Sequence, residues 1–163
     1  MGAPQGEPCG VAVRRCLPLT PGGFVVDVLY TAVATARGGR DGRVVSDDGV
    51  LDLELAYPKE LGGPEGSGKT NPEQLFAAGY AACFLNALKR VAKEQSADAT
   101  GAAMTARVGL GTVGSDFGLV VTLVGSLPSL TPEQGHALME AAHGVCPYSR
   151  ATRGNVEVTL ELA

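Results

Sequence analysis

The stretch "TNPEQLFAAGYAACF", residues 70–84, predicts the helix around which the rest of the chain is arranged. Asn71 is a favourable N-cap, and Pro72 suits the first position of a helix. Gln74 stands where a capping box carries Glu or Gln. The apolar pattern continues to about Gln95, so we expect one long helix over this region.

Cys83 stands about twelve residues into this predicted helix. Residues 75–88 are apolar on nearly all sides, which predicts a buried helix. The helix dipole acts mainly within the first and last turns, so it does not lower the pKa of a mid-helix thiol, and burial alone raises that pKa. A reactive Cys83 therefore needs a cation from another element. The alternative is a small apolar residue in a core.

The preceding residues, Gly63 to Thr70, match the phosphate-binding pattern G-x-x-x-x-G-K-[ST]. That loop requires a helix that starts at its own Gly-Lys-Thr, with free N–H groups aimed at the phosphates. Pro72 delays the helix start until after Asn71. Residues 56–63, "AYPKELGG", also form a poor buried strand, and no apolar strand ends in an Asp for Mg²⁺. We interpret residues 63–70 as a loop that leads into a capped helix.

The remaining pattern predicts further strands and helices in the order βββαββαβ, which is typical of an α+β fold with long helices against antiparallel sheet. Alternation and β-branched residues predict strands over residues 25–36, 44–46, 50–57, 102–113, 117–127 and 155–163, with turns at 37–43 and 114–116. A second helix is expected from Thr131 to about His143, and a short one after Cys146, where Pro147 follows.

The composition indicates a single globular domain and narrows the function classes. The chain has 163 residues, 45% of them hydrophobic, and a net charge of −4 without a basic stripe, which argues against nucleic-acid binding. No apolar run approaches a membrane span, and prolines and glycines interrupt the segment after Arg14-Arg15, which argues against a secretory signal. We therefore expect a cytoplasmic protein, in which cysteines rarely form structural disulfides.

Residues 1–23 are rich in Gly and Pro without a sustained period, and we expect a flexible N-terminal extension there. The domain proper is expected over residues 24–163. Cys9 and Cys16 fall in the extension, and no role is assigned to them.

Three motifs carry a resemblance to a known family: "YTAVATARGGRDGRVVSDDGVLDLELAYPKELGG", "TNPEQLFAAGYAACF" and "CPYSRATRGNVEV". Together they resemble the organic hydroperoxide resistance proteins of the Ohr/OsmC family, over roughly residues 28–163. The resemblance implies an OsmC-like α+β fold, with antiparallel sheets and two long central helices, in an intertwined homodimer. It also implies a thiol peroxidase that needs no cofactor and no metal.

The same resemblance assigns roles to four residues. Cys83, from "AACF", is implied as the peroxidatic cysteine, and Cys146, from "CPYS", as the resolving one. Arg40, from "GGRDG", and Glu73, from "NPEQ", complete the implied site. This assignment makes physical sense because Arg40 supplies a cation from outside the helix, while Glu73 anchors its guanidinium. Without the resemblance, a solvated turn arginine and a first-turn acid are the simpler interpretations.

Spacing adds a hypothesis about assembly. Glu73 precedes Cys83 by ten residues, which is roughly 15 Å along a straight helix. One Arg40 side chain would have to stretch to reach both within one chain. We therefore expect the site to be shared across the dimer, with Arg40 and Glu73 reaching the partner's cysteine.

The implied cycle passes through a Cys83 sulfenic acid and a Cys83–Cys146 disulfide. The family implies dihydrolipoamide or a lipoylated protein as the reductant, rather than thioredoxin. Phe76, Tyr80 and Phe84 are candidates for contact with the alkyl part of the hydroperoxide, with plain core packing as the equal alternative.

Three other interpretations of the cysteines remain open. A cysteine hydrolase requires a histidine beside Cys83, and His136 and His143 are the candidates. A metal site would use Cys83, His143 and Cys146, although a fourth ligand is missing. A non-enzymatic redox sensor would use the same two cysteines, but no basic surface suggests a transcription regulator.

Overall fold

The computed structural model of this protein describes residues 26–163, and it divides the chain after Ala32. The predicted extension and its cysteines, Cys9 and Cys16, lie outside the described residues. Residues 26–32 are exposed and have no regular secondary structure, so the strand predicted over residues 25–36 is wrong for that part. A β-branched run becomes a strand only where a neighbour accepts its backbone hydrogen bonds, and within the described chain that condition begins at Ala34.

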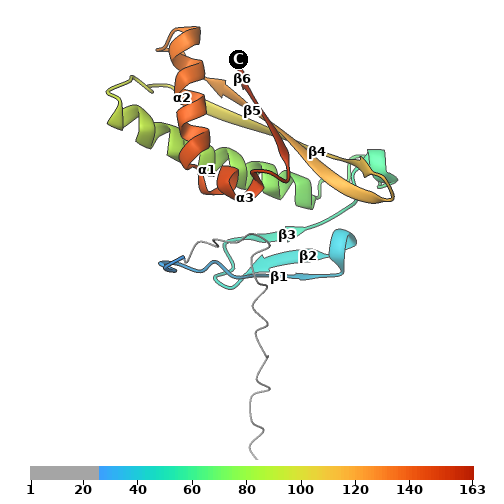
Figure 1. The fold of residues 1–163 in the computed structure, drawn as a ribbon. Helices are drawn as coiled ribbons and strands as arrows, with labels where there is room; N and C mark the ends of the chain where they lie inside the picture. The colour runs from blue at the N-terminus through green and yellow to red at the C-terminus, as the bar shows by residue number, and fades with distance from the viewer. Residues whose placement is uncertain (1–25) are drawn as a thin grey trace, which may run out of the picture. The chain divides into compact units, whose positions relative to one another are not determined.

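The first sheet holds the turn that carries Arg40. Its strands, β1 (Ala34–Arg37), β2 (Arg43–Ser46) and β3 (Asp52–Glu54), pair in that order and are antiparallel (Figure 1). A short 3₁₀ turn, η1 (Gly39–Asp41), connects β1 to β2. Gly42 has no room for a side chain, because a Cβ there would lie 1.7 Å from the Arg37 carbonyl oxygen.

The long helix α1 (Pro72–Glu94) confirms the helix predicted from the opening stretch. The Asn71 side chain caps it by accepting a hydrogen bond from the Gln74 N–H at 2.9 Å. Gln74 does not close a capping box, since its side chain accepts a hydrogen bond from the Thr70 hydroxyl instead.

The loop before α1 does not have the geometry of a phosphate-binding loop. The Thr70 N–H donates to the Glu54 carbonyl, and the Thr70 carbonyl accepts from the Ala56 N–H. The helix begins two residues after Thr70, so its first N–H groups do not surround residues 63–70. The interpretation of this segment as a loop leading into a capped helix is confirmed.

The second sheet consists of β4 (Ala103–Val113), β5 (Asp116–Ser126) and β6 (Glu157–Leu162), in that order. The strands β4 and β5 form an antiparallel hairpin, whereas β6 runs parallel to β5, with Val121 opposite Val158. The expectation of purely antiparallel sheets is therefore corrected at this one pair. The reason is the helical crossover between these strands, formed by α2 (Pro132–Val145) and α3 (Pro147–Thr152), which returns the chain in the same direction.

The core lies between this sheet and the helices. The helix α1 packs on β4, α2 packs on β6, and the two helices contact each other (Figure 1). The buried side chains of the core come from α1, β5 and α2, and they include Tyr80, Phe84, Leu88, Val121, Leu123, Leu138, Met139 and Ala142. The α+β fold with two long central helices is thus confirmed. Among the described residues, none of the helices combines the length and the apolar character that crossing a membrane requires.

The cap at Asn71 is expected to stabilise the helix that carries Cys83. Asn71→Ala removes the side chain that satisfies the Gln74 N–H, and it should lower the free energy of unfolding by about 1 kcal/mol. Urea unfolding followed by circular dichroism at fixed protein concentration measures this loss. Asn86→Ala, at an exposed position of the same helix, should cause none, because alanine is the better helix former. Equal losses in the two variants would rule out capping as the cause.

Candidate functional site

The two cysteines of the folded body lie side by side. The Cys146 thiol donates a hydrogen bond to the sulfur of Cys83 at 3.7 Å, although 63 positions separate the residues in sequence. Both thiols are free. A disulfide requires sulfurs at about 2.05 Å, so a small approach of the two side chains is enough to form the bond. Cys83 is partly exposed, whereas Cys146 is fully buried.

The local sequence around Cys146 explains how this contact arises. Cys146 is at once the C-cap of α2 and the N-cap of α3, with an extended backbone at ψ 127°. Pro147 disfavours a helical conformation for the residue before it, so α2 ends there. Proline is then well suited to the first position of a new helix. The resulting change of direction brings α3 into contact with α1.

The electrostatic environment of Cys83 within one chain favours the neutral thiol. Burial is the main effect, and it raises the pKa of Cys83. A hydrogen bond from the Tyr148 backbone N–H lowers that pKa, but the Cys146 thiol raises it again. None of the main contributions comes from a basic side chain of the described residues. A cation is therefore what this site still needs for a thiolate.

Arg40 and Glu73 form the second pair of expected site residues. The two guanidinium NH₂ groups of Arg40 donate to the two carboxylate oxygens of Glu73 at 2.7 and 2.6 Å. The side chains are 27% and 15% exposed, respectively, so solvent screens this ion pair only in part. Hydrogen bonding from Arg40 lowers the pKa of Glu73 below its ordinary value. The Arg40 guanidinium also lies 6.0 Å from the ring centre of Tyr57.

The four residues expected at the site thus lie as two separate pairs. No hydrogen bond or ion pair among the described residues joins Arg40 to Cys83. Both pairs have one member on α1, and these members are ten residues apart, about 15 Å along the helix. The helical spacing of Glu73 and Cys83 is as expected from the sequence, and the shared site inferred from it stays a prediction.

The three aromatic residues predicted near the substrate differ in exposure. Tyr80 and Phe84 have no exposed surface in this chain, which favours packing as their role, while Phe76 is only partly buried. Sequence reasoning missed a fourth aromatic, Tyr148, which is 39% exposed and stacks on Phe76 with ring centres 6.2 Å apart. Its ring passes over Gly79, where a Cβ would come within 3.2 Å of the tyrosine oxygen. A glycine inside an apolar helix was the sequence feature that could have indicated this close approach of another side chain.

The histidines do not complete an alternative site in the described part of the chain. His136 is exposed. The His143 ring lies 6.4 Å from that of Phe84, and its buried Nδ1 has no hydrogen-bond partner there. Nor do the described residues contain a group of three His, Cys, Asp or Glu side chains that would hold a metal ion. The hydrolase and metal interpretations therefore have no geometric support.

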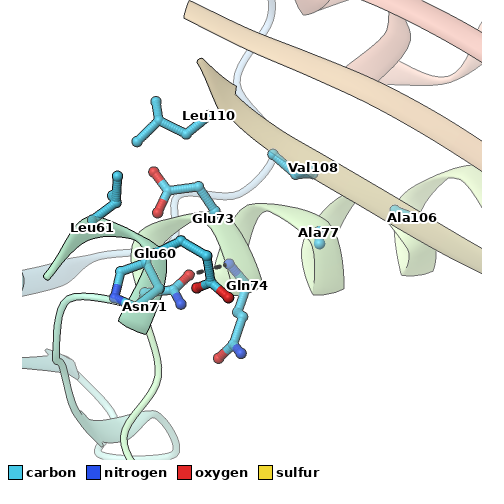
Figure 2. Close-up of a pocket in the computed structure, with 10 residues that line it drawn as sticks. Glu60, Leu61, Asn71, Glu73, Gln74, Ala77, Ala106, Val108 and Leu110 are labelled. Atoms are coloured by element: carbon cyan, nitrogen blue, oxygen red, sulfur yellow. Dashed lines mark hydrogen bonds between the residues drawn. The ribbon is translucent and has the colours of Figure 1, made fainter. Parts of the chain in front are cut away.

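A cavity of about 500 Å³ lies beside Glu73 rather than beside the thiols (Figure 2). The Glu73 side chain lies between Leu61 and Leu110 in this view. The lining comes from η2 (Lys59–Leu61) with the residue before it, the start of α1 and the inner face of β4: Pro58, Glu60, Leu61, Asn71, Glu73, Gln74, Ala77, Ala106, Val108 and Leu110. Most of these lining residues are apolar, so the Arg40–Glu73 ion pair lies next to a mainly apolar cavity.

The ion pair predicts a pH-dependent contribution to stability. Because the folded-state pKa of Glu73 is lowered, the pair stabilises the fold above about pH 4.5, the ordinary value. That contribution is lost as the pH falls through the lower folded-state pKa. Glu73→Gln should cost about 1–2 kcal/mol of unfolding free energy at pH 7, and this difference from wild type should shrink below pH 4.5.

Urea unfolding of both proteins between pH 7 and pH 3 measures this difference. Glu94→Gln removes an exposed partner of Arg90 and should cost less than about 0.5 kcal/mol at any pH. A Glu73→Gln difference that stays constant over the whole range would contradict the ion pair as its source.

Comparison with known proteins agrees with this fold. The family profile described as OsmC-like protein matches residues 63–161. An organic hydroperoxide resistance protein of Xanthomonas axonopodis pv. citri is 53% identical over 137 residues, which cover 83% of this chain and 96% of the relative. The crystal structure of an organic hydroperoxide resistance protein from Legionella pneumophila superposes with a TM-score of 0.78 at 48% identity, covering 84% of this chain and 99% of that one. For OhrB of Bacillus subtilis the TM-score is 0.76 at 50% identity, with 83% and 100% covered. The chain therefore belongs to the OsmC-like family and, within it, to the organic hydroperoxide resistance proteins.

Proposed function

We propose that this protein is a cysteine-based peroxidase that reduces organic hydroperoxides to alcohols and so protects the cell from them. The observation that carries the proposal is the contact between the Cys83 and Cys146 sulfurs at 3.7 Å. Two thiols at this distance suit a cycle that ends in a disulfide. The relatives named for organic hydroperoxide resistance support this substrate class.

The different exposure of the two thiols supports one assignment of roles. Cys83 is partly exposed and open to a hydroperoxide, whereas the buried Cys146 is within reach of Cys83. The Cys83 thiolate attacks the terminal oxygen of R–O–O–H, the O–O bond breaks, and the alkoxide leaves as the alcohol after taking a proton. Cys83 is then a sulfenic acid. The Cys146 sulfur attacks it, water leaves, and the Cys83–Cys146 disulfide forms.

The cation that ionises Cys83 comes, in this proposal, from a second copy of the chain. Burial raises the pKa of Cys83, and none of the main contributions to that pKa comes from a basic side chain of the described chain. Arg40 is held by Glu73, and the positions of Glu73 and Cys83 on α1 are about 15 Å apart along the helix axis. In a homodimer, the Arg40–Glu73 pair of one subunit lies beside the Cys83 thiol of the other. The guanidinium then offsets the raised pKa of that thiol, and the spacing along α1 within one chain no longer separates them.

Substrate and reductant follow from chemistry and family. Phe76 is the candidate contact for the alkyl group, with Tyr80 and Phe84 packed behind it. A dithiol reduces the disulfide by exchange. The family relationship favours dihydrolipoamide or a lipoylated protein for this step, and the cytoplasm as its location.

Cysteine variants test the peroxidase proposal directly. Stopped-flow mixing with tert-butyl hydroperoxide should show no reaction of Cys83→Ser beyond the rate of free thiols. Cys146→Ser should react once, to a sulfenate that dimedone traps on Cys83. Hydrogen peroxide serves as the matched substrate without an alkyl group, and it should react more slowly. Undiminished hydroperoxide consumption by Cys83→Ser would end the proposal.

Mixed dimers test the shared site. Cys83→Ser and Arg40→Ala should each be inactive alone, with activity reduced by at least about 100-fold. If Arg40 serves the partner's cysteine, refolding the two variants together restores one intact site in each mixed dimer, up to half the wild-type activity per mixed dimer. No restoration, with mixed dimers verified by native mass spectrometry, would place Arg40 and Cys83 of each site in the same chain.

A further inference from the structure

Three buried hydroxyl groups connect α1 to α3 next to the two thiols. The Tyr80 hydroxyl donates to the Ser149 hydroxyl oxygen at 2.9 Å and lies 3.2 Å from that of Thr152. The Thr152 hydroxyl also bonds to the carbonyls of Tyr148 and Ser149, within α3. Tyr80 and Ser149 are 0% exposed and Thr152 is 5% exposed. We call Tyr80, Ser149 and Thr152 the hydroxyl cluster.

The cluster lies in register with the thiol pair. Tyr80 precedes Cys83 by three residues on α1, and Ser149 follows Cys146 by three residues in α3. Residues three apart on a helix share a face, so Tyr80 and Cys83 lie on one face of α1. The hydroxyl contact joins this face to α3, and the thiol contact joins it to the N-cap residue of α3. The first is a hydrogen bond that the proposed reaction leaves intact, and the second is the contact that the proposed reaction changes.

Apolar packing alone would not fix this register. Dispersion and burial are non-directional, and α3 has only six residues, so it has little stability of its own. Hydrogen bonds between buried hydroxyl groups are directional, and in a dry core an unmade one is costly. A sliding or rotation of α3 on α1 would break them. The cluster therefore restricts α3 to the position in which the Cys146 sulfur faces Cys83.

We propose that the hydroxyl cluster is a positioning device for the resolving step, which keeps Cys146 close enough to capture the oxidised Cys83 before a second hydroperoxide does. This proposal rests on the peroxidase function above. Two reactions compete for the same sulfenic acid. In the first, the Cys146 thiol attacks Cys83–SOH, an S–S bond forms, and water leaves. In the second, another R–O–O–H transfers its terminal oxygen to give the sulfinic acid and an alcohol.

The competition gives a specific measurement. Wild type and variants react with rising concentrations of tert-butyl hydroperoxide, remaining thiols are alkylated, and intact mass separates the disulfide from the sulfinic acid. Thr152→Val keeps the shape but removes the hydroxyl. It should lower the hydroperoxide concentration that converts half of Cys83 to sulfinic acid by about fivefold, the effect of one hydrogen bond. Thr152→Ser keeps the hydroxyl and should restore the wild-type value.

Ser149→Ala removes the acceptor of the Tyr80 hydrogen bond and should act in the same direction as Thr152→Val. It carries the test if Thr152→Val does not fold, as judged by circular dichroism. Ser129→Ala is the matched control, because its exposed hydroxyl bonds to the Thr100 carbonyl, away from α3. A wild-type threshold in both cluster variants would overturn the proposal, and so would an equal shift in Thr152→Ser.

A second readout needs no hydroperoxide. At equilibrium with reduced and oxidised glutathione, the ratio of Cys83–Cys146 disulfide to dithiol reports how strongly the fold favours the contact of the two sulfurs. This ratio should fall by up to about fivefold in Thr152→Val and remain unchanged in Ser129→Ala. An unchanged ratio in Thr152→Val would overturn the positioning role. A wild type that forms the disulfide with glutathione but ignores hydroperoxides would instead refute the proposed function alone.

Discussion

The contact between α3 and α1 is the constraint on which the site depends. Cys83 is fixed on the long helix α1, so the position of its partner thiol depends on where α2 ends and how the six-residue helix α3 docks. The turn at Cys146-Pro147 directs α3 toward α1, and the sulfurs end 3.7 Å apart. Hydrogen bonds between the Tyr80 hydroxyl and the hydroxyls of α3 add directionality that packing lacks. In the proposed cycle the two thiols form and break a bond in every turnover, and such a fixed approach favours that step.

The second constraint is electrostatic, and it concerns the two separate pairs, Cys83 with Cys146 and Arg40 with Glu73. Burial raises the pKa of Cys83 within a single chain. Arg40 is bound to Glu73, and no hydrogen bond or ion pair among the described residues joins it to Cys83. Each pair has its own internal contact. The two thiols share a hydrogen bond, and Arg40 and Glu73 form a bidentate ion pair. The union of the two pairs in a dimer would place a cation beside a desolvated sulfur, where Coulomb attraction is strongest. A subunit that remains unassembled would then keep its thiol in the less reactive form.

Particular elements show how far sequence reasoning reaches. Asn71 and Pro72 indicate the start of α1, and the same proline argues against a phosphate-binding loop from local sequence alone. Thr131 began α2 with a complete capping box. The strand expected over residues 25–36 was mostly wrong, since strand formation depends on a partner that local pattern does not reveal. The parallel pairing of β6 with β5 was also missed, because alternation is the same in parallel and antiparallel edge strands.

The sequence by itself determined the helices, their caps, the family motifs and the identity of the candidate reactive residues, because these depend on near neighbours along the chain. Only the tertiary structure decided three contacts: the hydrogen bond between Cys83 and Cys146, the ion pair of Arg40 with Glu73, and the hydrogen bond from the Tyr80 hydroxyl to α3. These contacts join residues 33 to 69 positions apart. Their geometry follows from how helices and sheets pack, and no local pattern encodes that packing.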